Sequence, residues 1–322
     1  MKRLRRTLVY HAARGFTALF ERLPRPAALT LGGMLGLALY KIQRRDAWRA
    51  ERNLRLAYPG TYNLKQSRAL AQGAFINTGF HICDTIRSRS RYHSELADLL
   101  DVTGLEHFER IYRRGHGVVA ATGHIGAFEL LAAFFGRSGY KTAVVGRAAY
   151  ERRLDQLLVE TRARNNVVTI PTTEPLAFAR ALKAGFAVGV LIDNDSHRVR
   201  SEYLESCGRL ARTPIGQTVI GLRVAAGFMP LVCRRHAGRY HLRFFPEFYP
   251  RDFGPGRTGS RLRAAELTWR MRRILDEQIA EHPTQWPWVH NRWRSAPGDD
   301  EYPLPGLRLW RQGACQRGKI TA

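Results

Sequence analysis

The pattern of hydrophobic and polar positions begins with a helical N-terminal part. Behind a basic start, apolar side chains recur at helical spacing on one stripe: Leu8, Val9, Ala12, Phe16, Leu19 and Phe20. After Pro24 and Pro26, residues 27–40 form a nearly continuous apolar run. Because this run is shorter than the roughly 20 residues that a spanning helix needs, we expect residues 1–45 to form two helices that lie in a membrane interface or dip into it.

Two other interpretations of residues 1–45 stay open at this point. A cleaved secretory signal also has a basic start, but Arg14 and Glu21 interrupt the first apolar stretch, and no convincing small-residue cleavage site follows Tyr40. An ordinary pair of packed helices fits the same spacing.

The rest of the chain alternates short apolar runs with helical patterns. A helical region at 46–89, broken at Pro59-Gly60, comes first. Strands are then predicted at 117–122, 141–145, 167–170, 187–192, 228–234 and, as an edge strand, 240–245. Helices are predicted between them and beyond them at 127–137, 154–164, 175–183, 216–226 and 259–281. This alternation predicts an α/β fold with a mixed, mostly parallel sheet flanked by helices, whose ligands bind at the carboxyl ends of the strands.

We therefore divide the chain into three parts. Residues 1–45 are the membrane-associating helices, residues 46–296 the α/β domain, and residues 297–322, which are polar and rich in Gly and Pro, a flexible tail.

The charge of the chain is strongly positive, with 52 Lys and Arg against 27 Asp and Glu and a net charge of +25. Such a charge attracts polyanions, among them anionic lipid, an acidic carrier protein and nucleic acid, although part of the Arg excess can be compositional bias. We expect an anionic membrane surface, and no nucleic acid because no reader motif is present. The four cysteines are widely spaced, so we expect neither a metal site nor another cofactor.

The most informative segment is 121–130, in which a strand ends at Gly123-His124 and a helix follows at once. A neutral imidazole is a suitable base for a hydroxyl proton near neutral pH, and a carboxylate on its second nitrogen fixes the tautomer. We predict that His124 is the base and that Glu129 orients it. Glycine at 126 would let a bulky substrate approach the backbone.

The same segment resembles a signature of the bacterial lipid A late acyltransferase family (lauroyl and myristoyl transferases), within the glycerolipid acyltransferase superfamily. Residues 124–129 are similar to the family's His-x-Gly-Asn-Trp-Glu box. Residues 53–59 resemble its Asn-Leu-x-x-x-Phe-Pro element, and 211–216 its Thr-rich turn. Residues 285–293 are close to its C-terminal Trp-x-Trp-x-His-x-Arg signature, so the resemblance covers nearly the whole chain.

The resemblance implies that His124 and Glu129 are the general base and its orienting carboxylate. Arg147 stands where the family has a site arginine, and Asp193 and Asp195 stand where it has an acidic pair. We expect these three residues, with Gly126 and Arg292, to bind substrate. The expected donor is an acyl thioester of acyl carrier protein or coenzyme A, the acceptor a hydroxyl of a lipid A precursor, and the location the cytoplasmic face of the bacterial inner membrane.

The sequence leaves alternatives open for the acceptor and for the class of function. Ala127 and Phe128 depart from the family's Asn and Trp, which leaves another glycolipid, a lysophospholipid, a phosphatidylinositol mannoside or an aminolipid open as acceptor. From a different class, a basic nucleic-acid-binding protein would fit the charge. A lipid-binding scaffold that has lost catalysis is disfavoured by the intact His124 and Glu129.

Overall fold

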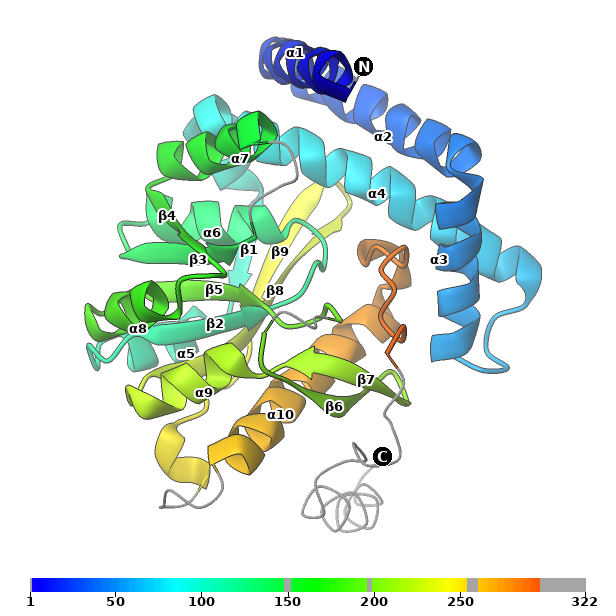
Figure 1. Cartoon of the computed structure of the whole chain (residues 1–322). Coiled ribbons are helices and arrows are strands. Elements are labelled where there is room, and N and C mark those ends of the chain that lie inside the picture. The colour runs from blue at the N-terminus through cyan, green and yellow to red at the C-terminus, as the bar shows by residue number, and fades with distance from the viewer. Residues whose placement is uncertain (1, 148–151, 196–198, 254–259, 296–322) are drawn as a thin grey trace.

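The computed structural model describes residues 2–147, 152–195, 199–253 and 260–295 (Figure 1). The predicted tail at 297–322 lies outside these residues. The chain begins with four helices: α1 (Lys2–Arg22), α2 (Arg25–Ile42), α3 (Arg44–Ala57) and α4 (Leu64–Arg91). Helix α4 packs against each of the other three, and Figure 1 shows α1 and α2 along its outer side.

Helix α2 packs on α4 through small residues. A Cβ added at Gly32 would come within 2.3 Å of the Cys83 sulfur, so the two helices approach too closely for any larger side chain. The opposite side of α2 is open, with Met34 62 % and Ile42 76 % exposed. Within the described residues, no helix combines the length and the apolar character that crossing a membrane requires. Helix α2 is therefore packed on one side and exposes apolar side chains on the other.

The α/β part contains a seven-stranded sheet in the order β1-β9-β8-β2-β5-β3-β4. Its strands are β1 (Leu100–Thr103), β2 (Val118–Thr122), β3 (Thr142–Gly146), β4 (Val167–Pro171), β5 (Ala187–Leu191), β8 (Gly227–His236) and β9 (Arg239–Phe244). A separate antiparallel hairpin joins β6 (Ser201–Ser206) to β7 (Arg209–Pro214). The flanking helices are α5 (Leu105–Tyr112), α6 (Phe128–Arg137), α7 (Arg152–Arg164), α8 (Pro175–Lys183), α9 (Gly216–Arg223) and α10 (Ser260–Glu281). Shorter helical turns span Tyr92–Leu96, Ala97–Leu99, Pro250–Phe253 and Pro283–Gln285.

The sheet is mostly parallel, as the sequence predicted. Strand β2 pairs in parallel with β5 and β8, and β3 pairs in parallel with β4 and β5. Strand β9 runs antiparallel to β8, and β1 pairs in parallel with β9. The prediction that 240–245 is an edge strand is wrong, because the short strand β1 covers β9. Polar and apolar alternation reports which face of a strand is buried, not whether a neighbour pairs with its edge.

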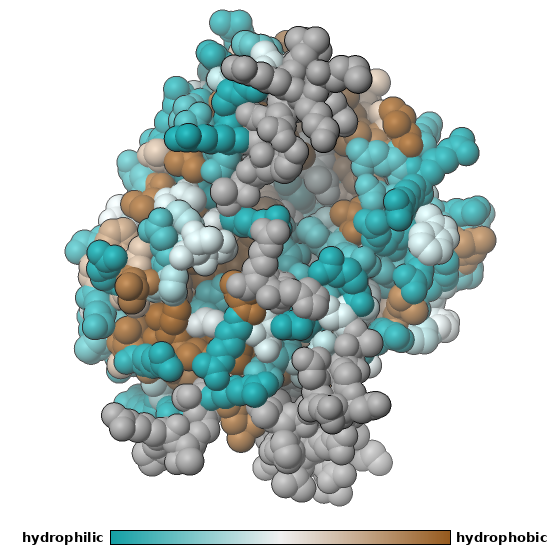
Figure 2. All heavy atoms as spheres, in the orientation of Figure 1, coloured by the Kyte–Doolittle hydropathy of each residue, from teal (hydrophilic) through white to brown (hydrophobic). Residues whose placement is uncertain are grey.

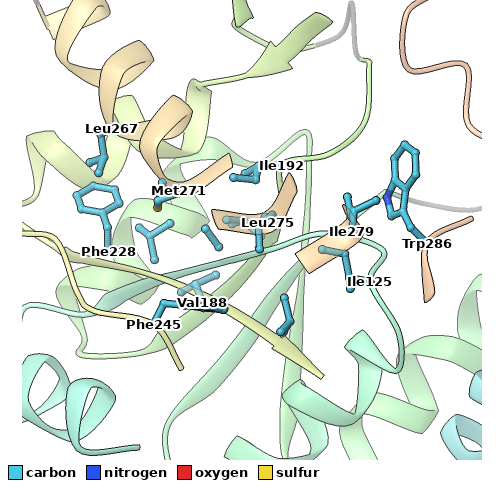
Figure 3. Packing of buried hydrophobic residues seen from close by; sticks show 14 of the residues in the cluster. Ile125, Val188, Ile192, Phe228, Phe245, Leu267, Met271, Leu275, Ile279 and Trp286 are labelled. Atoms are coloured by element: carbon cyan, nitrogen blue, oxygen red, sulfur yellow. The ribbon is translucent and has the colours of Figure 1, made fainter. Parts of the chain in front are cut away.

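Two hydrophobic cores fill the two faces of the sheet. In β2, Val118 and Ala120 face the core shared with α5 and α6, whereas Val119 and Ala121 face the other core. Figure 3 shows that second core, in which Leu267, Met271 and Leu275 of α10 pack against the strands. Because both faces are covered, the central strands are almost continuously apolar.

Arginine is used inside the fold as well as on the surface. Arg87, Arg272 and Arg292 are among the largest fully buried side chains. Arg87 donates to the carbonyls of Phe20 and Leu23 at the end of α1, at 2.5 and 2.7 Å. On the face drawn in Figure 2, hydrophilic side chains are spread among hydrophobic ones. Part of the arginine excess is therefore structural.

Candidate active site

The site lies at the carboxyl ends of two neighbouring parallel strands. His124 follows β2 and Asp193 follows β5, and these strands pair in register from Val118 and Ala187 onward. Between them, a Cβ on Gly123 would come within 2.9 Å of the Asp193 carboxylate. Glycine at 123 thus leaves room for that carboxylate to reach the backbone of the next residue.

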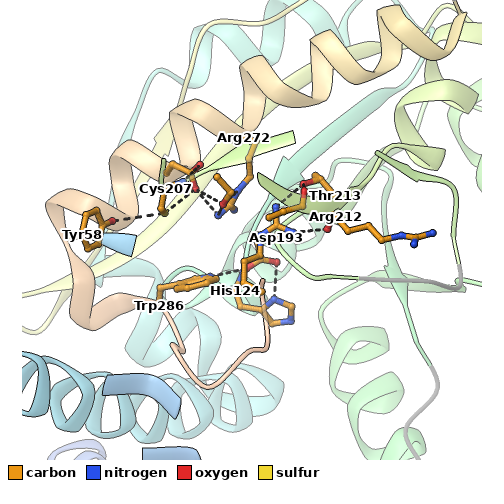
Figure 4. A network of polar contacts seen from close by, with 12 residues as sticks. Tyr58, His124, Asp193, Cys207, Arg212, Thr213, Arg272 and Trp286 are labelled. Carbon is orange, nitrogen blue, oxygen red and sulfur yellow. Dashed lines mark hydrogen bonds and ion pairs between the residues drawn. The ribbon is translucent and has the colours of Figure 1, made fainter. Parts of the chain in front are cut away.

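Asp193 binds His124 at two points. Its Oδ2 accepts the backbone N–H of His124 at 2.7 Å, and its Oδ1 lies 2.9 Å from the ring Nδ1. Oδ2 also accepts the indole N–H of Trp286 at 2.9 Å (Figure 4). An ionised carboxylate only accepts hydrogen bonds, so in the neutral ring Nδ1 carries the proton and Nε2 keeps its lone pair.

Burial and charge act in opposite directions on this pair. The Asp193 side chain is 0 % exposed and the His124 side chain 20 %. Burial tends to raise the pKa of Asp193, but the charge and the hydrogen bond of His124 outweigh it, and the pKa lies well below its usual range. Burial tends to lower the pKa of His124, but Asp193 and, more weakly, Glu129 raise it above 6.5. The imidazolium form is therefore stabilised by its carboxylate neighbour.

The expected contact between Glu129 and the second nitrogen of His124 is not the one observed. Glu129 lies in the first turn of α6, and its two carboxylate oxygens accept hydrogen bonds from Arg162 of α7, at 2.6 and 3.0 Å. Asp193 takes the position on Nδ1 instead. The physical reason is direction: the side chain of Glu129 lies beside α7, while the strand end carrying Asp193 lies directly beside His124. Glu129 still contributes negative charge near the ring.

Gly126 shapes the loop that carries His124. Its φ is +57°, and an added Cβ would meet the carbonyl oxygen of Cys233 at 2.1 Å. Its N–H donates to the carbonyl of Gln285 at 2.7 Å, and the next N–H, of Ala127, donates to Cys233 at 2.9 Å. The loop is thus fixed against β8 and the C-terminal segment, and only glycine fits at this position.

A cavity of about 560 Å³ opens beside this pair. Helices α1, α4 and α7 and the segment 284–290 form its walls, and His124, Gly126 and Glu129 line it. Most of the other side chains on its walls are apolar. The ring of His124 therefore faces a space able to hold a hydrocarbon group.

A second histidine, which the sequence analysis left without a role, lies against the first. The ring centroids of His124 and His290 are 4.8 Å apart. Burial, and then the charge of His124, lower the pKa of His290 to about 4, so it stays neutral near neutral pH. Asn53 of α3 holds the segment in place, because its amide donates to the carbonyls of Trp288 and His290, both at 2.8 Å. The motifs at residues 53–59 and 285–293, which are far apart in sequence, are therefore in direct contact.

The remaining predicted substrate-binding residues lie elsewhere. Arg147 is exposed at the end of β3. Asp195 accepts the backbone N–H of Ser295 at 3.0 Å. Arg292 is fully buried and donates to the Arg212 carbonyl and the Thr213 hydroxyl, at 2.7 and 2.6 Å. The contacts of Arg292 argue against a role in binding substrate, because its guanidinium links the C-terminal segment to β7.

Two partners of the acidic side chains in this site, Trp286 and Arg162, had no assigned role in the sequence analysis. Trp286 lies within the C-terminal signature at residues 285–293, but its position in the sequence gives no sign of its contact with Asp193. Trp286 and Trp288 are both buried, with ring centroids 4.7 Å apart. No sequence signal distinguished Arg162 from the many other arginines. Among the described residues, no three His, Cys, Asp or Glu side chains are grouped so that they could hold a metal ion.

Comparison with known proteins identifies the family of this chain. The sequence model of the family described as "Bacterial lipid A biosynthesis acyltransferase" matches residues 1–295. The lipid A biosynthesis palmitoleoyltransferase of Escherichia coli K12 is 25 % identical over 292 residues, covering 88 % of this chain and 90 % of the relative. The lipid A biosynthesis lauroyltransferase of the same organism is 25 % identical over 286 residues, with the same coverage. A Shigella flexneri lipid A biosynthesis acyltransferase is also 25 % identical.

Proposed function

Because the chain belongs to the bacterial lipid A biosynthesis acyltransferase family, we propose that it transfers a fatty acyl chain from a thioester donor to a hydroxyl of a lipid A precursor. The observation that carries this proposal is the imidazole of His124, bound by Asp193 on Nδ1 and facing a largely apolar cavity. The donor is an acyl carrier protein or coenzyme A thioester. The relatives act on lipid A by name, which supports the acceptor class.

In the proposed reaction, Nε2 of His124 takes the proton of the acceptor hydroxyl as its oxygen attacks the thioester carbonyl carbon. The C–S bond then breaks, and the leaving thiolate takes the proton from the imidazolium. Asp193 keeps Nδ1 protonated and stabilises the transient positive charge. No covalent acyl-enzyme is needed, since the acceptor oxygen is itself the nucleophile.

Glu129 and the start of α6 complete the proposed site. Glu129 adds negative charge near His124 and holds the guanidinium of Arg162. Helix α6 begins at Phe128, so the positive end of its dipole lies beside the reacting centre, where the carbonyl oxygen becomes an oxyanion. This placement favours the charge distribution of acyl transfer.

Membrane association is part of the proposal. Helices α1 and α2 carry basic and apolar side chains, and the free side of α2 exposes Met34 and Ile42 at 62 % and 76 %. Such helices bind anionic lipid surfaces through buried apolar area and charge attraction. We place the enzyme on the cytoplasmic face of the inner membrane, where a soluble thioester meets a lipid acceptor.

The test is acyl transfer by purified protein in detergent. Labelled acyl thioester and an extracted lipid acceptor should give labelled lipid, and His124→Ala should reduce the rate by at least about a thousandfold. The matched control is His241→Ala. His241 lies on β9, and its ring Nδ1 is 3.5 Å from a carboxylate oxygen of Asp101. Unchanged transfer by His124→Ala, or an equal loss in both variants, would contradict the proposed mechanism.

A further inference from the structure

A second cavity adjoins the catalytic one. It has a volume of about 350 Å³ and lies between α2, α4 and the segment 287–289. The two cavities share lining side chains, namely Phe16, Ala74, Thr78, Ile82, Pro287 and Val289. The second cavity therefore lies next to the one at His124, on the side of α4 that faces α2.

The two cavities differ in polarity. The catalytic cavity is lined by several polar side chains, among them Asn77, His81 and Arg89. The second cavity is lined by aliphatic and aromatic groups and glycines, and the hydroxyl on its wall, that of Thr78, donates to the carbonyl of Ala74 in its own helix. Among the described residues, no charged side chain lines it. Such a wall favours a hydrocarbon group over any polar ligand.

The glycines on this wall are fixed by packing. A Cβ on Gly36 would come within 2.3 Å of the Phe75 carbonyl, and one on Gly79 within 2.0 Å of the Gly32 carbonyl. The closely packed α2 and α4 backbones are thus the rigid part of the cavity wall. Larger side chains, such as Leu35 and Leu39 of α2, form its outer part. The size of the space at this outer part is therefore set by exchangeable side chains.

From the shared walls and the apolar lining we infer that the second cavity holds the distal part of the transferred acyl chain, and that Leu35 at its outer part helps to set the preferred chain length. The inference rests on the proposed function. The donor's chain, and not the acceptor's hydrocarbon, is the occupant for a physical reason. A chain delivered by a soluble thioester must be sheltered from water along its whole length, whereas the acceptor's chains remain in the bilayer. Each methylene beyond the end of the cavity meets a wall or water.

The test measures transfer from a series of saturated acyl thioesters of increasing length, with substitutions at one position. Leu35→Trp fills the outer part of the cavity, and Leu35→Ala enlarges it. Because Leu35 is 38 % exposed, both variants are expected to fold. The matched control is Met34→Trp, since Met34 is the adjacent residue, is 62 % exposed and does not appear among the lining residues of either cavity.

We expect Leu35→Trp to reduce kcat/KM for the wild type's preferred donor by about tenfold or more, while shorter donors keep their rate. Leu35→Ala should shift the preference toward longer donors, and Met34→Trp should keep the wild-type profile. The inference is overturned if both Leu35 variants keep the wild-type length preference. It is also overturned if they change the acceptor KM equally for every donor, because the cavity then holds the acceptor's hydrocarbon. By contrast, absence of transfer from every thioester by the wild type refutes the proposed function itself.

Discussion

Asp193, and not Glu129, is the carboxylate that holds the ring of His124. Its two oxygens bind the backbone N–H and the ring Nδ1 of the same residue, at 2.7 and 2.9 Å. This double contact fixes both the loop and the tautomer. Asp193 is fully buried, so its charge acts on His124 with little screening by water.

The first prediction concerns this contact. Asp193→Asn should lower kcat by about a hundredfold or more, because a neutral amide stabilises the imidazolium poorly and can leave the wrong tautomer. The control is Asp101→Asn, which removes an exposed carboxylate from the β1 edge and should leave the rate unchanged. A loss of less than a few-fold in Asp193→Asn would show that another group orients His124. Steady-state kinetics with one thioester and one lipid acceptor measure kcat for both variants.

The second prediction concerns pH. The pKa of His124 is raised above 6.5 in the folded protein, and the base must be unprotonated to accept a proton. The value of kcat/KM should therefore fall as pH decreases, with a midpoint above pH 6.5. In Asp193→Asn the carboxylate charge that raises the pKa of His124 is absent, whereas the burial that lowers this pKa remains. The midpoint should therefore move to lower pH. A midpoint that is the same in both proteins would contradict the assigned pairing.

The third prediction concerns Glu129 and Arg162, whose side chains are 14 % and 11 % exposed. Glu129→Gln and Arg162→Gln should each lower the free energy of unfolding by about 1–3 kcal/mol, because each leaves a charge without its partner. The double variant should lose less than the sum of the two. The control cycle uses the more exposed pair Arg239 and Asp101, for which the coupling should be smaller because water screens the two charges. Additive losses at Glu129 and Arg162 would exclude the ion pair.

The fourth prediction distinguishes the roles of two buried tryptophans, Trp286 and Trp288. The indole N–H of Trp286 donates to Asp193, and that of Trp288 donates to the carbonyl of Pro283 at 2.6 Å. Replacing either by Phe should cost about 1–3 kcal/mol of stability, since each leaves a buried acceptor with one donor fewer. Only Trp286→Phe should also lower kcat, by up to about a hundredfold, because Asp193 is then less firmly placed. Denaturant unfolding and kinetics on the same preparations give both quantities.

The fifth prediction concerns Asn53, which links α3 to the C-terminal segment. Asn53→Asp should destabilise the protein more than Asn53→Ala, because a carboxylate would face two carbonyl oxygens without a proton to donate. Both variants should also lower kcat, since His290 and the cavity wall depend on this contact. A lower melting temperature for Asn53→Ala than for Asn53→Asp would contradict the donor role of Asn53.

The sequence by itself determined the fold class and the position of His124 in the fold. Alternation of apolar runs and helical patterns requires a mostly parallel sheet, because each element must bury one face against another. The Gly-flanked turn after a buried strand placed His124 at a carboxyl end, where parallel strands bring loops together. The family signatures at 53–59, 124–129 and 285–293 were likewise readable without coordinates.

Only the tertiary structure decided which groups touch. Asp193 lies 69 residues from His124, and Arg162 lies 33 residues from Glu129. Spacing along the chain therefore favoured Glu129, which is near in sequence but directed toward α7. The expected role of Arg292 in binding came with the family resemblance, and its guanidinium is buried. Strand order and helix packing set these directions, and they depend on pairings between distant segments that no local pattern encodes. The same is true of the cavities along α4, whose walls come from both ends of the chain.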